Sequence, residues 1–267
     1  MGKKLILIKF GGSAITDKLK PYTANFEVIK KLSKEVKEAR EEKELNLIIG
    51  HGSGSFGHSS AKKYRTAEGF VNDESKYGIC VVQNDAAKLN RIVVNNLLNV
   101  GEKAISIQPS SCCIAENSKI KEFYLKPIKK LLEYGMIPIP YGDIGLDLKK
   151  EGCILSTEEI LSHLAKNLGF ESRIIMVGKV DGVCTADPTK DEKAKFVEEI
   201  NKDNWEEVKK YLGGSDGTDV TGGMVHKIEQ GIELAKEGVE IEIINGLKEG
   251  NLKKCLLGER VGTLIKW

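Results

Sequence analysis

The sequence predicts an α/β fold in which helices pack around a mostly parallel β-sheet. The chain has 267 residues, of which 40% are apolar and 30% charged, a composition typical of a globular protein with a sizeable core. Short β-branched runs alternate with longer stretches of helical periodicity, which is typical of βαβ units. Glycine-rich loops follow the first two of these runs, where parallel-sheet proteins bind phosphates.

Short apolar runs bounded by polar residues or glycine predict the strands. In chain order they are Leu5–Phe10, Asn46–Gly50, Ala104–Gln108, Ile137–Tyr141, Arg173–Val177, Val239–Asn245 and Thr263–Trp267. Residues 147–155, with Lys149, Lys150, Glu151 and Gly152 in the middle, predict a hairpin.

Amphipathic periodicity predicts the helices between these strands. In Phe26–Glu44, for example, Val28, Ile29, Leu32 and Val36 form one apolar stripe among Lys and Glu. The other expected helices are Tyr77–Val100, Leu125–Tyr134, Glu158–Leu168, Asn204–Tyr211 and Met224–Lys236. Because no repeat or low-complexity linker interrupts the chain, we expect one domain, residues 1–267, with two lobes that meet near residues 155–172.

Charge and hydropathy argue against several classes of protein. The 41 Lys and Arg residues nearly balance the 39 Asp and Glu, for a formal charge of +2, which argues against a dedicated nucleic-acid binder. The longest apolar runs are about four to six residues, far below the ~18 that a spanning helix needs. The six cysteines form no C-x-x-C pair, which favours buried thiols over disulfides or zinc. We therefore expect a cytoplasmic protein with no dedicated metal-ligand cluster.

Three glycine clusters, each near a lysine or a histidine, predict a site for a phosphate-rich ligand. The first is Lys9-Phe10-Gly11-Gly12-Ser13, and the second runs from His51 to His58. The third is Thr221-Gly222-Gly223-Met224, followed by Lys227. Glycine lets backbone N–H groups approach an anion closely, and a helix N-terminus adds partial positive charge.

Residues 52–57 match the dinucleotide fingerprint G-x-G-x-x-G, which leaves an NAD-dependent oxidoreductase as an alternative. The acidic residue that should hold the ribose falls in a polar loop rather than at a strand end, so the context is poor. The Walker motif and the protein-kinase motifs are absent. A non-catalytic nucleotide sensor is a third reading.

Lys9 is the most informative single residue, because an ammonium at the end of an apolar strand needs an anionic neighbour. Asp143, which follows Pro140-Tyr141-Gly142 at another strand end, is a candidate partner. We expect His58 to face the ligand and His51 to pack locally.

Taken together, several motifs resemble the amino acid kinase superfamily and, within it, the isopentenyl phosphate kinase family. They are Lys9-x-Gly-Gly-Ser13, Thr16-Asp17-Lys18, Ser55-Phe56-Gly57-His58 with Ala61-Lys62-Lys63-Tyr64, Ser106 to Ser111, Gly142-Asp143, Val180 to Pro188, and Asp219 to Met224 with Lys227. The likeness runs from Leu5 to Gly262 with the motifs in the same order.

The resemblance implies a three-layer α/β/α sandwich, a homodimer, an acceptor-binding lobe at 1–165 and an ATP-binding lobe at 166–267. It also implies that Lys9 and Lys18 neutralise the transferred phosphoryl group and that His58 holds the acceptor phosphate of isopentenyl phosphate. The expected catalytic residues are Lys9, Lys18, His58 and Asp143. The expected nucleotide-binding residues are Gly11, Gly12, Ser13, Gly54, Lys179, Asp181, Asp187, Gly223 and Lys227. The expected acceptor-binding residues are Ser53, Gly54, His58, Val82, Ala86, Gly142 and Thr157.

Elementary chemistry agrees with such a reaction. A phosphate acceptor with a second pKa near ~6 is already a nucleophile at neutral pH, so no general base is needed. Lysines and Mg²⁺ would offset the repulsion between two phosphates. Because Mg²⁺ commonly binds substrate phosphates, it needs no carboxylate-rich motif.

For the organic part of the acceptor, the helix from Tyr77 offers an apolar stripe, and we expect Val82 and Ala86 to line a slot for a short prenyl tail. Three departures from the family pattern leave the ligands open. Ser53 and Thr157 stand where glycines are usual, and Gly178-Lys179 replaces a Thr-Asp pair. A fosfomycin-type phosphonate kinase, or a kinase of another small phosphomonoester, therefore stays as an alternative.

Overall fold

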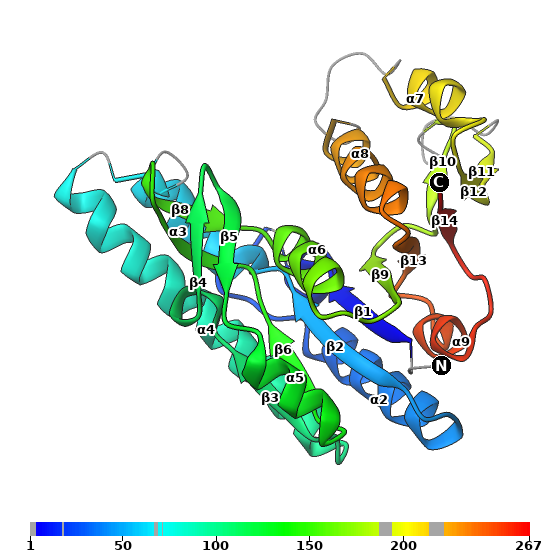
Figure 1. The fold of residues 1–267 in the computed structure, drawn as a ribbon, viewed down its shortest axis with the longest axis horizontal. Coiled ribbons are helices and arrows are strands. Elements are labelled where there is room, and N and C mark those ends of the chain that lie inside the picture. The colour runs from blue at the N-terminus through cyan, green and yellow to red at the C-terminus, as the bar shows by residue number, and fades with distance from the viewer. Residues whose placement is uncertain (1–3, 18, 67–68, 71, 187–193, 214–221) are drawn as a thin grey trace.

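In the computed structural model, which describes residues 4–17, 19–66, 69–70, 72–186, 194–213 and 222–267, the core element is a six-stranded sheet (Figure 1). Its strand order is β12-β14-β13-β9-β1-β2, and β13–β14 is its one antiparallel pairing. The strands of this sheet are β1 (Leu5–Phe10), β2 (Asn46–His51), β9 (Ser172–Gly178), β12 (Glu199–Ile200), β13 (Glu240–Asn245) and β14 (Thr263–Ile265). A parallel bridge from His51 to Tyr141 connects β2 to the pair formed by β3 (Ala104–Ile107) and β6 (Ile137–Pro140).

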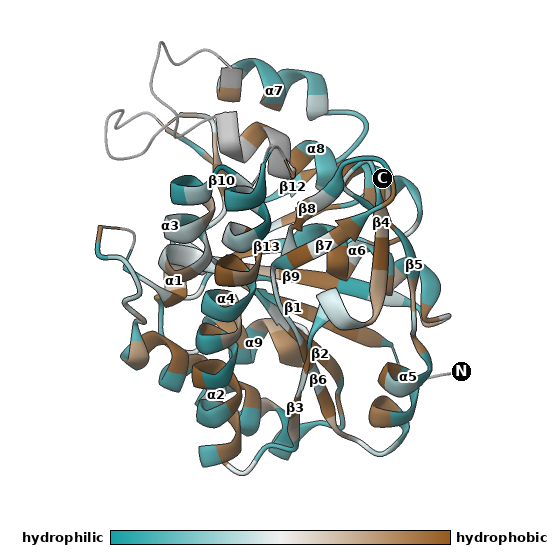
Figure 2. Ribbon diagram, turned by 90° about the vertical axis from the view of Figure 1, so that its left-hand side faces the viewer, coloured by the Kyte–Doolittle hydropathy of each residue, from teal (hydrophilic) through white to brown (hydrophobic). Residues whose placement is uncertain are grey.

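Each face of the sheet is covered by helices because side chains alternate along the strands. In β1, Leu5 and Leu7 belong to one buried cluster, which includes residues of α6 and α8. Ile6, Ile8 and Phe10 belong to a second cluster, with residues of α2, α4 and α9. Figure 2 shows the central strands as largely brown and the flanking helices as mixed brown and teal. The result is a three-layer sandwich.

The helices have ends that the local sequence explains. Asn25 caps α2, Asn72 forms a capping box with Ser75 at the start of α4, and Ser156 caps α6. The helices are α1 (Gly12–Ile15), α2 (Phe26–Glu42), α3 (Gly54–Tyr64), α4 (Asp73–Asn99), α5 (Lys126–Glu133), α6 (Thr157–Asn167), α7 (Trp205–Gly213), α8 (Gly222–Lys236) and α9 (Asn251–Leu257).

A second, four-stranded sheet lies beside α3, α4 and α6 in the order β5-β4-β7-β8. Its strands are β4 (Cys113–Glu116), β5 (Lys119–Phe123), β7 (Asp143–Asp147) and β8 (Glu151–Leu155). A 3₁₀ turn, η2 (Pro109–Ser111), precedes it, and a small pair is formed by β10 (Val183–Cys184) and β11 (Phe196–Val197).

The structure confirms the predicted α/β fold with its mostly parallel sheet. The predicted strands and helices are present, with ends that differ by a few residues. The hairpin is longer than predicted, since β7 begins at Asp143 rather than Asp147. The sequence analysis did not predict α1, α3, α9, β4, β5, β10, β11 or β12 as elements. Among the described residues, no helix has the length and apolar character needed to cross a membrane.

Candidate active site

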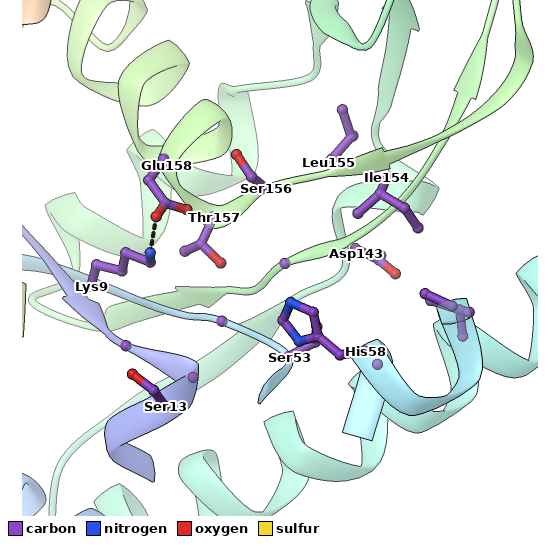
Figure 3. Close-up of a pocket in the computed structure, with 17 residues that line it drawn as sticks. Lys9, Ser13, Ser53, His58, Asp143, Ile154, Leu155, Ser156, Thr157 and Glu158 are labelled. Carbon is purple, nitrogen blue, oxygen red and sulfur yellow. Dashed lines mark hydrogen bonds and ion pairs between the residues drawn. The ribbon is translucent and has the colours of Figure 1, made fainter. Parts of the chain in front are cut away.

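The site is a cleft of about 310 Å³ at the carboxyl ends of β1 and β2, between α3 and α6. Parallel strands place their following loops at one edge of the sheet, and the first two glycine loops therefore meet there. Figure 3 shows Lys9 and Glu158 at one end and His58, Asp143 and Ile154 at the other. The lining residues are Lys9, Gly11, Gly12, Ser13, Gly52, Ser53, Gly57, His58, Ala61, Val82, Gly142, Asp143, Ile154, Leu155, Ser156, Thr157 and Glu158.

The two glycine loops pack backbone against backbone. A Cβ on Gly12 would lie 2.7 Å from the amide nitrogen of Gly54, and a Cβ on Gly54, whose φ is +49°, would lie 2.3 Å from Thr16 Oγ1. The Thr16 hydroxyl donates to the Gly12 carbonyl at 2.7 Å and accepts from the Ser55 amide at 3.0 Å. Glycine at positions 12 and 54 is therefore required by contact between the loops. Gly54 itself is buried and is not among the lining residues.

Lys9 lies on the face of β1 that looks toward α6, because it continues the alternation of Leu5 and Leu7. Its ammonium is paired with the carboxylate of Glu158 in the first turn of α6, and the two side chains are only 13% and 15% exposed. The anionic neighbour expected for Lys9 is present. It is Glu158, however, and not the Asp143 that the sequence analysis selected.

Asp143 is buried at the other end of the cleft, at the start of β7. Its Oδ2 accepts a hydrogen bond from the amide of Ser110 in η2 at 3.0 Å, and its Oδ1 has no partner among the described residues. Burial raises the pKa of this carboxyl group above its ordinary value. The position of Asp143 thus supports the 109–111 turn rather than Lys9.

His58 stands in the second turn of α3 with its exposed ring over the cleft (Figure 3). Its Nδ1 lies 2.6 Å from the carbonyl oxygen of Gly54. Because that carbonyl only accepts, Nδ1 carries a hydrogen and donates. Nε2 is then left for the ligand, and it donates to a phosphate oxygen when the ring is doubly protonated.

The apolar end of the cleft is formed by Ala61 of α3, Val82 of α4 and Ile154 of β8. These three residues belong to a small hydrophobic cluster with Ile79 and Ile144. Of the pair expected to line a prenyl slot, Val82 lines the cleft. Ala86, one helical turn further on, is fully buried and is not among the lining residues, which corrects that expectation.

Ser53, Gly142 and Thr157 lie together at the middle of the cleft. A Cβ on Gly142 would be 3.0 Å from Thr157 Oγ1 and 3.6 Å from the Ser53 amide nitrogen. Gly142 is thus enclosed between the second glycine loop and the first turn of α6, so that the three expected acceptor residues are neighbours.

The residues expected to bind nucleotide are only partly described. Gly11, Gly12 and Ser13 line the cleft. Lys179 and Asp181 follow β9 and are exposed; Asp181 accepts from Asn245 at 2.9 Å and pairs with Lys248 at 2.8 Å. The hydrogen bond from Lys248 has the largest effect and that from Asn245 the next, and both lower the pKa of Asp181 below its ordinary value.

The rest of the expected set falls at the limits of the described chain. Gly223 is the second residue of α8. Lys18, Asp187 and the side chain of Lys227 lie outside the described residues.

The sequence profile of the amino acid kinase family matches residues 4–245. The chain belongs to the amino acid kinase family. It is 37% identical to isopentenyl phosphate kinase from Methanothermobacter thermautotrophicus and 34% identical to that from Methanocaldococcus jannaschii, with 98% of each chain covered in both alignments. A solved structure of isopentenyl phosphate kinase superposes with a TM-score of 0.83 at 34% identity, covering 98% of this chain and 100% of the other.

Within this amino acid kinase fold, sequence reasoning missed two features of the site. Glu158 was noted only as the start of a helix, although an acidic residue in a first turn near a strand-end lysine is a usable signal. Ile154 was noted only as part of a hairpin, because its contact with Val82 depends on how β8 packs against α4.

Proposed function

We propose that this member of the amino acid kinase family transfers the γ-phosphoryl group of ATP to isopentenyl phosphate, giving isopentenyl diphosphate and ADP. The observation that carries the proposal is the composition of the cleft at the carboxyl ends of β1 and β2. One end holds the Lys9 ammonium and the first glycine loop, and the other end holds the apolar residues Ala61, Val82 and Ile154 beside the His58 ring. A ligand with a phosphate head and a short hydrocarbon tail fits both ends.

The reaction needs charge neutralisation and alignment more than proton transfer. An oxygen of the acceptor phosphate attacks the γ-phosphorus, the bond from that phosphorus to the bridging β-oxygen breaks, and the electron pair leaves with ADP. Because the acceptor oxygen is already ionised, no proton has to be removed. Lys9 stabilises the charge on the transferred group, and Glu158 holds Lys9 at the cleft.

His58 binds the acceptor phosphate through Nε2, since Nδ1 is engaged with Gly54. A phosphate dianion stabilises the doubly protonated ring that this contact requires. Lys18 and Lys227 join Lys9 around the transferred group in this proposal. Val82, Ala61 and Ile154 enclose the tail.

An Mg²⁺ ion bound with the ATP phosphates is part of the proposal. The described residues contain no group of three or more His, Cys, Asp or Glu suited to a metal. Mg²⁺ commonly binds one or two carboxylates together with substrate phosphates, and the described carboxylates that line the cleft are Asp143 and Glu158. The ion would neutralise phosphate charge.

The division into an acceptor lobe at 1–165 and a nucleotide lobe at 166–267 also belongs to the proposal, as do a homodimeric state and a cytoplasmic location. Gly11, Gly12 and Ser13 would contact ATP from the first loop. Lys179, Asp181, Asp187 and Gly223 would contact it from the second lobe. Every kinase named in the comparisons favours ATP chemistry over the NAD-dependent alternative.

The test is an assay of ADP release with Mg-ATP and a panel of acceptors. The panel holds isopentenyl phosphate, dimethylallyl phosphate, longer prenyl phosphates and fosfomycin, with a control lacking acceptor. We expect the highest kcat/KM with isopentenyl phosphate and little ADP without acceptor. A higher kcat/KM with fosfomycin, or ADP release that ignores the acceptor, would contradict the proposal.

A further inference from the structure

We propose that Thr157 is a positioning residue whose hydroxyl ties the first turn of α6 to the end of β2 and thereby sets Glu158 against Lys9. The inference rests on the proposed phosphoryl transfer and adds a residue to it. It starts from a hydrogen bond between two segments 106 positions apart, in which Thr157 Oγ1 donates to the carbonyl oxygen of His51 at 2.8 Å.

The Thr157 side chain is enclosed on both sides and has no alternative place. It is 2% exposed. A Cβ on Gly50 would lie 2.9 Å from its methyl group, and one on Gly142 would lie 3.0 Å from its hydroxyl. The methyl group therefore packs against Gly50 of β2, and the hydroxyl bonds His51 at the end of the same strand. Such packing gives the hydrogen bond a single geometry.

The acceptor of this hydrogen bond is itself firmly held. The buried His51 ring donates from Nδ1 to the Gly52 carbonyl at 3.1 Å and accepts at Nε2 from Asn90 at 3.1 Å. It also stacks on Tyr141, with ring centroids 5.6 Å apart and planes 8° apart. The His51 carbonyl is thus a fixed point on the sheet, next to the glycine loop that carries His58.

A neighbouring residue of this turn is bound to a different part of the fold. Ser156 caps the Glu159 amide at 3.1 Å within the turn. Glu159 itself accepts from the Ile120 amide at 3.0 Å and pairs with Lys119 at 2.8 Å. The two Glu159 side-chain contacts tie the turn to β5 in the second sheet. Thr157 ties the same turn to the central sheet, on which Lys9 lies.

The consequence for the reaction follows from the order of residues. Glu158 is the next residue after Thr157, and its carboxylate holds the Lys9 ammonium. Ile160 and Leu161 pack with Leu5 and Leu7 of β1, so the body of α6 would stay on the central sheet. Loss of the hydroxyl would release only the first turn, which Glu159 binds to β5, and would shift Glu158 relative to Lys9. Displacements of about 1 Å near a reacting group reduce turnover by up to about 100-fold. Because the Thr157 hydroxyl is buried and bonded to the sheet, the KM values should change much less than kcat.

The experiment compares Thr157→Val, Thr157→Ala and Thr157→Ser with the wild type under saturating Mg-ATP and isopentenyl phosphate. We expect kcat to fall about tenfold in the Val and Ala variants, with both KM values within about twofold of the wild type. The Ser variant keeps the hydroxyl and should retain at least half of kcat. Ser33→Ala is the matched control, because the buried Ser33 hydroxyl bonds the Ile29 carbonyl within α2 at 2.8 Å and does not line the cleft, and its kcat should be unchanged.

A double variant separates positioning from general damage. If Thr157 acts through Glu158, Thr157→Val added to Glu158→Gln should lower kcat no further than Glu158→Gln alone. Additive losses of kcat in the double variant would overturn the inference. A wild-type kcat in a folded Thr157→Val or Thr157→Ala variant would overturn it too, and so would a Thr157→Ser variant as slow as Thr157→Val. Thermal melting identifies a variant that fails to fold, and the Ala variant, which adds no atom, then decides. A wild type inactive on every acceptor overturns the proposed function as well, whereas an active wild type with full-rate variants overturns only the role of Thr157.

Discussion

Protonation of His51 should make the stability of this protein fall steeply in mild acid. The ring is completely buried, and burial lowers its pKa from an ordinary 6.5 to about 4. The folded chain therefore keeps His51 neutral at pH 5, whereas the unfolded chain protonates it below pH 6.5. Because the unfolded state then binds more protons, the free energy of unfolding decreases as the pH falls through this window.

The size of the effect follows from the two pKa values. One pKa unit corresponds to about 1.4 kcal/mol, so a shift of about 2.5 units is worth about 3 kcal/mol when the pH has fallen to about 4. At pH 5, which is 1.5 units below the ordinary pKa of 6.5, the same relation gives about 2 kcal/mol. Typical domains have only about 5–15 kcal/mol of stability, so this loss is readily measured.

Urea unfolding at pH 7.5 and pH 5.0 measures this loss. The wild type is compared with His51→Gln, which has no titratable ring, and with His163→Gln, a matched control at a half-buried histidine of α6. Other titrating groups contribute equally to all three proteins. We expect the wild type to lose about 2 kcal/mol more than His51→Gln between the two pH values. Burial also lowers the pKa of the half-buried His163, so His163→Gln should lie between the wild type and His51→Gln. An equal loss in the wild type and His51→Gln would refute the reasoning.

Further substitutions test the cleft. Lys9→Ala should lower kcat by about 100-fold or more, because a charge that stabilises the transferred phosphoryl group is lost; steady-state kinetics measures it. His58→Ala should reduce kcat/KM for the acceptor by at least tenfold while the KM for ATP stays within about twofold. Val82→Phe should raise the acceptor KM with little change for ATP. Gly12→Ala should destabilise the protein by about 1–3 kcal/mol in thermal melts, because its Cβ meets the Gly54 backbone at 2.7 Å.

Each of these has a control or a contradicting result. A His58→Ala enzyme with wild-type kcat/KM would remove the phosphate-binding role of that ring. Ala86→Phe is the counterpart of Val82→Phe: since Ala86 is buried away from the cleft, its main effect should be on stability. Gly178→Ala is the control for Gly12→Ala, because the nearest atom to its Cβ would be 4.0 Å away. Equal stability losses in the two glycine variants would contradict the contact argument.

Local patterns predicted the central sheet well, because each strand lies between two apolar layers. Leu5 to Ile8 reads as a continuous apolar run and is buried on both faces. The α2 stripe of Ile29, Leu32 and Val36 predicted the face that packs on the sheet. The second sheet was harder, since its short strands β4 and β5 mix polar and apolar residues. Helix α3 was not predicted because it begins with Gly54 and contains Gly57, and glycine is unfavourable in helices.

For the site, the sequence predicted that Lys9, Gly12 and His58 would meet at one edge of the sheet. It selected Asp143 for Lys9, although both Asp143 and Glu158 stand near strand or helix ends. The choice between them depends on which carboxylate the packing of α6 brings to the face of β1 that Lys9 shares with Leu7. Likewise, Val82 and Ala86 lie on one stripe of α4. Val82 lines the cleft beside Ile154 of β8, whereas Ala86 is buried in the core, and this difference depends on where β8 packs.

By itself, the order of residues predicted the strands of the central sheet other than β12, the edge at which the first two glycine loops meet, and the kind of anion that suits them, since periodicity and backbone freedom are local properties. Tertiary packing alone decided the partner of Lys9, the burial and neutrality of His51, and the bond from Thr157 to the end of β2. Each of these depends on atoms brought together from segments up to 149 positions apart. Desolvation and contact distance, which arise only when the chain closes on itself, set their chemistry.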